Sequence, residues 1–572
     1  MKKYLYMLGK KYLLIIGFLL FILPSCKDDI LNEVPLDFLS PDNAYLTEKG
    51  VIQGISGLHE RVRGAYYAMN EFGTMNWATH GSDLGYNGEV PQAGSGYLNS
   101  YLDLNPTFKA DTAHWNVAYR IIQRANVLIK EVSKLDPTVF DDGEAGKNLY
   151  LGEAKFFRAF AYRNLVSTYG DVPLLTEPVS TAKDDFVRTP AAEVRSQMEA
   201  DFKFAAENLP EPGKEAAPGR ITQGPAWHFL AETYLEEKEY QKAVDAATKV
   251  VDGYHYALMT KRFGVNLAKD VFGSGDVYYD LFSRGNQNLA ENTEAMWVIQ
   301  VEPLITGGSQ LATAYIFGPR YFDLALTPDG KKATLGTIYN GTYTGINDTL
   351  SRPTANARGT DFVFYGMWAS DWNNDIRNAK HNIKRTYYFD NPASAYNGQK
   401  IDFSLYTNPP RSNLMVDTCK ILFPSFIKFF DPQHYILQPN RAGSGITHKD
   451  WCALRFAETL LLRAEAYLDL NKPDLAAADI NQIRNRANAT PVKAADVTID
   501  YILDERAREL FGEEWRLIAL RRTGKLVERV KKYNNNPACP GAYIQDFNVL
   551  WPIPQAQIDL NVGAPFAQNP GY

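Results

Sequence analysis

The sequence predicts a mainly all-α fold in which pairs of helices form a scaffold and long irregular inserts interrupt it. Four segments carry apolar residues at helical spacing: Trp115–Leu135, Leu149–Tyr169, Gln223–Gly253 and Leu460–Arg486. Two of these segments contain the same pattern of two short helices joined by a turn. The inserts, around residues 72–110 and 256–450, are rich in loop residues and aromatic residues, with a few short strand-like runs such as Met296–Val301.

The repeated helix-pair pattern is clearest in Gln223–Gly253. The apolar face is formed by Trp227, Leu230, Ala231 and Tyr234 in the first helix, and by Tyr240, Ala243, Ala247 and Val250 in the second. The small residues Ala231 and Ala243 allow the two helices to approach closely. This is the spacing of a tetratricopeptide repeat (TPR). A second copy lies in Leu460–Arg486, where Asn471-Lys472-Pro473 supplies the turn and the Tyr-to-Ala interval is again nine residues.

Residues 1–25 have the pattern of a secretory signal peptide. Four lysines accompany an apolar run from Tyr12 to Leu23, which is too short to span a bilayer comfortably. Leu23-Pro24-Ser25-Cys26 resembles a bacterial lipobox, in which the sulfur of Cys26 carries the lipid. Lys27-Asp28-Asp29 resembles the charged tripeptide that directs Bacteroidota lipoproteins to the cell surface. The alternative is an ordinary cysteine after a conventional cleavage site.

Residues 26–572 are expected to form a single domain that contains both inserts. Removing residues 1–25 deletes four lysines and no acid, so the net charge falls from −6 to −10, and nucleic acid is not expected as a partner. A hydrophobic content of 45% with 22% charged residues excludes a disordered or polytopic membrane protein. The other cysteines, Cys419, Cys452 and Cys539, lack metal-ligand spacing and are interpreted as packing residues, with one disulfide as the alternative.

Familiar catalytic and cofactor-binding motifs are absent from the sequence. No HExxH, GxSxG, Walker loop or GxGxxG occurs, and the eight histidines are scattered. Asp371-x-Asn373-x-Asp375 begins like a calcium loop, but Ile376 stands where glycine is required and Asn382 where glutamate is required. We therefore expect no enzyme, no cofactor and no metal site. A pair of carboxylates for glycoside hydrolysis, unmarked by any motif, is the enzymatic alternative.

The densest charge cluster is Glu505–Arg516. We predict a helix in which acids and arginines three and four residues apart form salt bridges that lock it to the scaffold. The alternative is a binding site for an anion or a sugar acid.

Several motifs occur in a fixed order along the chain. They are Pro35–Phe38 with Ser40-Pro41, Glu153–Tyr162, Tyr169–Leu174, Glu505–Gly524, and Pro552-Ile553-Pro554 with Asn561. Together they resemble the SusD/RagB family of outer-membrane lipoproteins, over nearly the whole mature chain. Within Glu505–Gly524 the chain is similar to the family pattern "ER..EL..E..R...L.R.G". Ala519 stands where the family usually has Asp, so one internal salt bridge is expected to be missing.

The resemblance implies a SusD-like fold, with about four TPR helix pairs and an irregular glycan-binding half. It implies a surface-exposed protein, lipid-anchored in the outer membrane, that binds oligosaccharides without cleaving them. It also implies a partner, a SusC-like TonB-dependent transporter, which the TPR face mostly meets and which the protein caps like a lid. Two alternatives stay open: an extracytoplasmic glycan-active enzyme, and a transporter lid that binds peptide or another nutrient.

The chemistry of sugars indicates where to look for ligand contacts. Pyranose rings stack on aromatic side chains, and their hydroxyls bind Asp, Asn and Arg. The candidate ligand-binding residues in the two inserts are Trp77, Asp83, Tyr86, Asn87, Tyr315, Trp368 and Trp372. Core packing is the alternative role for each aromatic residue among them.

Overall fold

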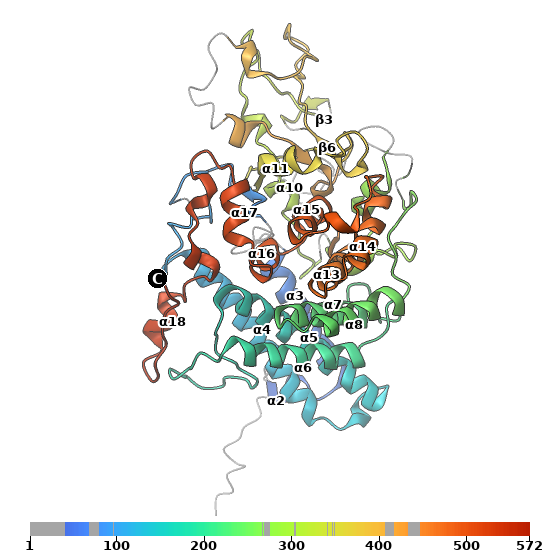
Figure 1. The fold of residues 1–572 in the computed structure, drawn as a ribbon, viewed down its shortest axis with the longest axis vertical. Helices are drawn as coiled ribbons and strands as arrows, with labels where there is room; N and C mark the ends of the chain where they lie inside the picture. Colours follow the sequence, from blue (N-terminus) through green and yellow to red (C-terminus); the bar gives the residue numbers. More distant parts are fainter. Residues whose placement is uncertain are drawn as a thin grey trace, which may run out of the picture.

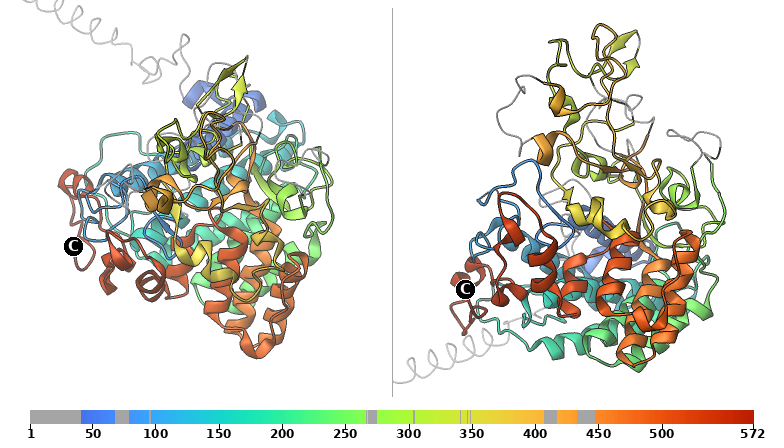
Figure 2. Two further views of the ribbon diagram at one scale, coloured as in Figure 1. Left: turned by 90° about the horizontal axis from the view of Figure 1, so that it is seen from above. Right: turned by 45° about the horizontal axis from the view of Figure 1, so that its top comes forward.

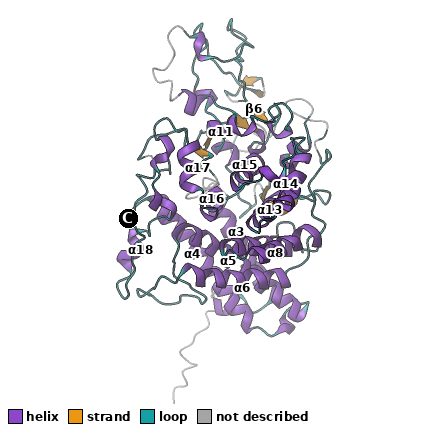
Figure 3. Cartoon of the chain, in the orientation of Figure 1, coloured by secondary structure: helices purple, strands orange, loops and turns teal. Residues whose placement is uncertain are grey.

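A computed structural model shows a layer of long helices with an irregular region above it (Figure 1). The structure describes residues 41–67, 79–94, 96–265, 267, 275–302, 305–339, 341–345, 347, 349–406, 417–432 and 447–572. Helices dominate the described chain and strands are few and short (Figure 3), so the predicted mainly all-α class is confirmed. Within this part of the chain, no helix combines the length and the hydrophobicity needed to cross a bilayer.

The scaffold is a series of helices in which α3 to α8 each pack against the next, and α13 packs against both α14 and α15. The first part comprises α2 (Pro41–Ala44), α3 (Glu48–Tyr66), α4 (Lys109–Lys134), α5 (Gly143–Tyr169), α6 (Ala191–Asn208), α7 (Gln223–Glu236) and α8 (Tyr240–Gly253). After the second insert come α13 (Phe456–Asp469), α14 (Pro473–Arg486), α15 (Ile499–Leu510), α16 (Arg516–Arg522), α17 (Leu526–Tyr533) and α18 (Gln555–Leu560). Helix α13 packs on α8, so the chain resumes the series where the insert interrupted it.

The two predicted helix pairs, α7–α8 and α13–α14, are confirmed and end their first helices in the same way. Lys238 and Asn471, each four residues after a tyrosine, have positive φ values of 62° and 56°. In each pair the next backbone N–H donates to the carbonyl of that tyrosine, Tyr234 or Tyr467, over 2.8 Å. This closes the last turn and reverses the chain. Ala243 is buried against the preceding helix, as the close-approach argument requires.

The inserts contain short antiparallel strand pairs that join their own segments and connect the two inserts to each other. These are β1 (Gly85–Tyr86) with β5 (Arg358–Gly359), β2 (Ala295–Ile299) with β8 (Trp451–Arg455), β3 (Ile338–Tyr339) with β4 (Thr342–Tyr343), and β6 (Ile383–Lys384) with β7 (Ser425–Phe426). The second insert also contains α9 (Val277–Phe282), α10 (Thr313–Ile316) and α11 (Asp361–Phe364). The β1–β5 pair joins the first insert to the second. The right view of Figure 2 shows the second insert projecting from the helical scaffold.

The C-terminal segment is hydrogen-bonded to the scaffold. The Trp551 N–H donates to the Thr168 carbonyl over 2.8 Å, and the Asn569 amide donates to the Tyr169 carbonyl over 2.9 Å. These bonds fix the segment to the end of α5. Trp551 is buried, so the segment also contributes to the core.

The charge cluster Glu505–Arg516 is not one helix. Helix α15 ends at Leu510 and α16 begins at Arg516. Gly512 between them has a φ of 73°, and a Cβ there would lie 2.4 Å from the Phe429 ring. The chain therefore turns at a position that favours glycine sterically and conformationally. The expectation of a continuous helix is wrong, whereas the expectation of salt bridges is confirmed.

Most of these salt bridges join different elements rather than neighbouring turns of one helix. Glu505 and Glu509 of α15 are fully buried and face a ring of arginines, which we call the α15 network. Its arginines are Arg377 of the second insert, Arg455 of β8, Arg484 and Arg486 of α14, and Arg508 of α15. Burial alone would raise the pKa of Glu505, but Arg377, Arg508 and Arg484 outweigh it and lower that pKa to about 2.

We predict that the Glu509→Gln variant is strongly destabilised. The Glu509 carboxylate lies 3.0 Å from Arg377 and 2.8 Å from Arg455 and also pairs with Arg486, so the variant leaves buried guanidinium groups undercompensated. The expected loss is about 3–5 kcal/mol of unfolding free energy, measured by urea denaturation. The control is Glu528→Gln, because Glu528 is exposed and its pair with Lys525 is worth about 1 kcal/mol at most. Equal unfolding midpoints for both variants would contradict the assigned role of the network.

Candidate functional site

The candidate residues of the first insert lie mainly in the interior. Trp77 is outside the described residues. Asp83 is fully buried, where Arg516 and Arg529 donate to its carboxylate over 2.7–2.8 Å. Burial would raise the pKa of Asp83, but both arginines reverse the shift and lower it. Asp83 therefore anchors the first insert to α16 and α17. Its negative charge is balanced by the two arginines, so a buried carboxylate at this position requires no ligand.

Asn87 is also buried and serves the backbone of its own loop. Its N–H donates to the Asn99 side-chain oxygen over 2.7 Å, and its own side-chain oxygen accepts from the Val90 N–H over 2.9 Å. These bonds shape the turn after β1. The sequence offered no sign of this use, because the partners of Asp83 and Asn87 are set by tertiary structure and loop geometry.

Tyr86 is the one described candidate of the first insert that reaches a cavity. It lies on β1 opposite Arg358 of β5, whose guanidinium is 5.2 Å from the tyrosine ring. The adjacent cavity has a volume of about 470 Å³, within the usual range for small-molecule sites. Its wall also contains Tyr365, Tyr387 and Arg385 of the second insert. The β1–β5 pairing thus brings candidate segments of both inserts to one place.

Trp368 and Trp372, four residues apart, have different environments. Trp368 is buried, and its indole N–H donates to the Val363 carbonyl over 2.9 Å, so it is a core residue. The side chain of Trp372 is 42% exposed and that of Tyr365 is 47% exposed. Their rings are nearly parallel, with an interplanar angle of 18° and centroids 6.3 Å apart. We call Tyr365, Trp372 and the adjoining Arg385 the aromatic platform.

Arg385 connects the aromatic platform to the cavity. Its guanidinium lies 4.7 Å from the Trp372 ring, and it donates to the Phe364 carbonyl over 2.8 Å and to the Asn378 side-chain oxygen over 2.6 Å. Burial lowers the pKa of Arg385 to about 10, against a small opposing effect of Tyr365, so the group is charged at neutral pH. A fixed cation against an aromatic face stabilises the position of both.

The loop that carries Trp372 is held by the residues on either side of it. Asp371 accepts from Arg484 over 2.7 Å and from the Thr490 hydroxyl over 2.6 Å. Asp375 accepts from Arg377 over 2.7 Å, which links the loop to the α15 network. These two carboxylates belong to the calcium-loop-like pattern of the sequence, but in the structure they accept hydrogen bonds from arginine side chains. Among the residues described, no cluster of three His, Cys, Asp or Glu side chains has a metal-binding arrangement.

Tyr315 lies apart from the aromatic platform. It is half-buried on α10, and its carbonyl accepts from the Thr354 N–H over 2.7 Å. It does not line the cavity beside Tyr86. The three cysteines Cys419, Cys452 and Cys539 are buried free thiols, which confirms their interpretation as packing residues.

Sequence reasoning missed several residues around the cavity. Exposed polar groups at its rim belong to Asp361, Lys400 and Asn535, and the Asp361 N–H donates to the Asn535 side-chain oxygen over 3.1 Å. Tyr365 could have been found as an aromatic residue near Trp372 in a Gly- and Asn-rich loop. Arg385 and Asn535 carried no sequence signal, because only the fold brings them to this cavity.

These features define a class of protein in which a helical scaffold displays irregular inserts with an exposed aromatic surface. Two family models match the chain: the SusD family over residues 359–572, and the family described as "Starch-binding associating with outer membrane" over residues 68–235. The chain belongs to the SusD/RagB family, as the motifs of the sequence predicted.

Individual relatives agree with this assignment over nearly the full length. SusD-like protein P38 of Formosa agariphila is 24% identical to this chain, over 93% of the length of both proteins. SusD-like protein P25 of the same organism is 23% identical, over 95% of the length of both. Among solved structures, a laminarin-binding SusD-like protein has a TM-score of 0.66 at 20% identity, over 92% of this chain and 100% of its own. Surface glycan-binding protein A from Bacteroides thetaiotaomicron, in complex with laminarihexaose, has a TM-score of 0.65 at 18% identity, over 91% and 99%.

Proposed function

We propose that this protein captures oligosaccharides at the cell surface and delivers them to a SusC-like TonB-dependent transporter of the outer membrane. Membership of the SusD/RagB family supports this function. So do structural relatives described as binding laminarin or laminarihexaose. The aromatic platform carries the proposal for this chain, because it is an exposed apolar surface beside polar groups.

The chemistry of the aromatic platform matches a sugar ring. The exposed Trp372 indole offers a flat face to the apolar C–H face of a pyranose. Asp361, Lys400 and Asn535 at the rim of the adjacent cavity supply donors and acceptors for hydroxyl groups. Since Asp371 and Asp375 hold the Trp372 loop through arginines, binding requires little ordering of the chain.

The anchoring and assembly of the protein are part of the same proposal. Residues 1–25 direct secretion, Cys26 carries the lipid, and residues 26–572 act as one unit at the surface of the outer membrane. Cys26 lies outside the described residues. The family description, which refers to association with the outer membrane, supports this location. The helical TPR face meets the transporter, while the aromatic platform of the second insert takes the ligand.

The alternatives differ from this proposal in measurable ways. A glycan-active enzyme would release shorter products when incubated for a long time with a polysaccharide, whereas a binding protein leaves chain length unchanged. A transporter lid for peptides or another nutrient would bind no glycan at all. The SusD family match and the structural relatives described as glycan-binding proteins favour the proposed function over both alternatives.

The variant Trp372→Ala is predicted to bind oligosaccharides more weakly. Removing the indole deletes the stacking face, with an expected loss of about 1–3 kcal/mol, or roughly tenfold to a hundredfold in affinity. Titration calorimetry with laminarihexaose and a panel of other neutral oligosaccharides measures the change. Far-UV circular dichroism should stay unchanged, because the ring is exposed.

Tyr343→Ala is the matched control. Tyr343 is 43% exposed, close to the 42% of Trp372, and belongs to the second insert, but it lies on β4 and is part of neither the aromatic platform nor the cavity wall. Its removal should leave affinity within twofold of the native protein. If a glycan binds and Trp372→Ala binds it normally, the aromatic platform is not the site. If no glycan binds, the glycan-capture function itself fails.

For the anchor, Cys26→Ala is expected to release the protein from the membrane fraction in cells that lack the transporter. The lipid is attached through the cysteine sulfur, and lipid chains supply the hydrophobic anchoring energy. Ser25→Ala, which keeps that sulfur, should stay in the membrane fraction. Fractionation in high salt followed by immunoblotting gives the result. A Cys26→Ala protein that stays in the membrane fraction would overturn the lipid-anchor proposal.

A further inference from the structure

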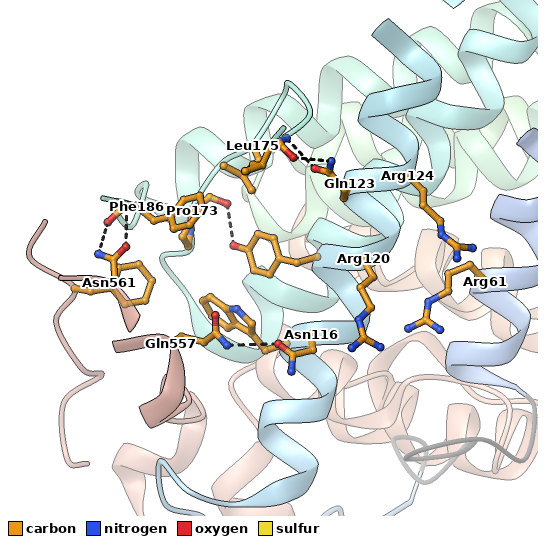
Figure 4. Close-up of a pocket in the computed structure, with 14 residues that line it drawn as sticks. Arg61, Asn116, Arg120, Gln123, Arg124, Pro173, Leu175, Phe186, Gln557 and Asn561 are labelled. Atoms are coloured by element: carbon orange, nitrogen blue, oxygen red, sulfur yellow. Dashed lines mark hydrogen bonds between the residues drawn. The ribbon is translucent and has the colours of Figure 1, made fainter. Parts of the chain in front are cut away.

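A second and larger pocket lies on the helical scaffold, away from the aromatic platform (Figure 4). Its volume is about 760 Å³. One face of α4 forms its floor, because residues 115, 116, 119, 120, 123 and 124 recur at intervals of four and project in the same direction. The segment 173–186 and the C-terminal residues 557–566 form the opposite wall. No residue is shared between this α4 pocket and the cavity beside the aromatic platform.

The walls of the α4 pocket are fixed by reciprocal hydrogen bonds. Gln123 exchanges two bonds with the backbone of Val179, over 2.9 and 3.1 Å. Asn561 does the same with the backbone of Phe186, over 2.7 and 2.9 Å. The Tyr119 hydroxyl donates to the Pro173 carbonyl over 2.9 Å. The pocket is therefore preformed, and a ligand would not have to order the three segments that build it.

The charge of the α4 pocket is unusual for a protein with a net charge of −6. Arg61 of α3 and Arg120 and Arg124 of α4 line it, and no aspartate or glutamate does. Figure 4 shows the three guanidinium groups gathered on one side, with the ring of Phe186 and the amides of Gln557 and Asn561 on the other. Arg120 and Arg124 are one helical turn apart, an arrangement of like charges that destabilises a helix slightly.

The lining combines three kinds of group that together select a ligand class. Guanidinium groups bind carboxylate and sulfate oxygens in paired hydrogen bonds. Trp115 and Phe566 provide aromatic surface, and Asn116 and Gln557 provide amides that can bind hydroxyl groups. A bare inorganic anion would use only the arginines. A saccharide unit that carries an acidic group would use all three.

We propose that the α4 pocket is a second binding site, specific for negatively charged saccharide units such as uronates or sulfate esters. This inference rests on the proposed function, since it takes the ligand to be a glycan. It adds a ligand class and a separate site, lined by the helical scaffold and the C-terminal segment. A glycan with both neutral and acidic units would then have two separate contact points on one protein.

The test compares acidic and neutral oligosaccharides on the full mature protein. The acidic probes are oligogalacturonates and sulfated galactan oligosaccharides, and the neutral probe is laminarihexaose. Calorimetry should show that the Arg120→Gln/Arg124→Gln double variant loses at least tenfold in affinity for an acidic probe, and that native binding weakens with added salt. The Arg120→Lys/Arg124→Lys variant, which keeps charge but not the paired geometry, should lose less. Both arginines are exposed, so an unchanged melting temperature is expected.

Trp372→Ala separates the α4 pocket from the aromatic platform. It should leave binding of the acidic probe unchanged, while the double arginine variant should leave binding of laminarihexaose unchanged. The inference is overturned if no acidic probe binds, if the Gln variant binds it normally, or if Trp372→Ala abolishes it. Binding of an acidic peptide but no acidic saccharide at the arginines would also overturn it. The glycan-capture function is judged independently, on the neutral panel and Trp372→Ala.

Discussion

The pairing of buried carboxylates with buried arginines is the constraint on which this structure depends. Glu505 and Glu509 of one short helix contact arginines from α14, β8 and the second insert, all away from water. Each charge is tolerable there only because several opposite charges surround it. Asp83 repeats the principle, since Arg516 and Arg529 fix the first insert to α16 and α17. The inserts are thereby held in defined positions on the helical scaffold.

This constraint also bears on the proposed binding surface. The loop that exposes Trp372 is fixed by Asp371 and Asp375, and Asp375 pairs with Arg377, which belongs to the α15 network. An exposed indole on an irregular loop is thus supported by the most highly charged part of the interior. The helical scaffold provides the position, the buried charges provide the rigidity, and a few exposed side chains provide the chemistry.

Local patterns in the sequence predicted the local structure well. The period of apolar residues located α7, α8, α13 and α14, and the short apolar run Met296–Val301 located β2, because both signals arise within a few residues. The site was harder to predict. Asp83 looked like a ligand-binding carboxylate, but its partner Arg516 lies 433 residues away. The stacking of Tyr365 on Trp372 and the approach of Arg385 likewise exist only in the folded chain.

A crystal structure of the protein with laminarihexaose, or with whichever neutral oligosaccharide binds most tightly, tests the central claim most directly. The account predicts electron density for a sugar ring parallel to the Trp372 indole, with hydroxyl groups reaching toward Arg385 or the rim of the cavity at Asp361 and Asn535. Well-ordered sugar density elsewhere, with the Trp372 face unoccupied, would contradict the claim that the aromatic platform is where this protein captures glycan.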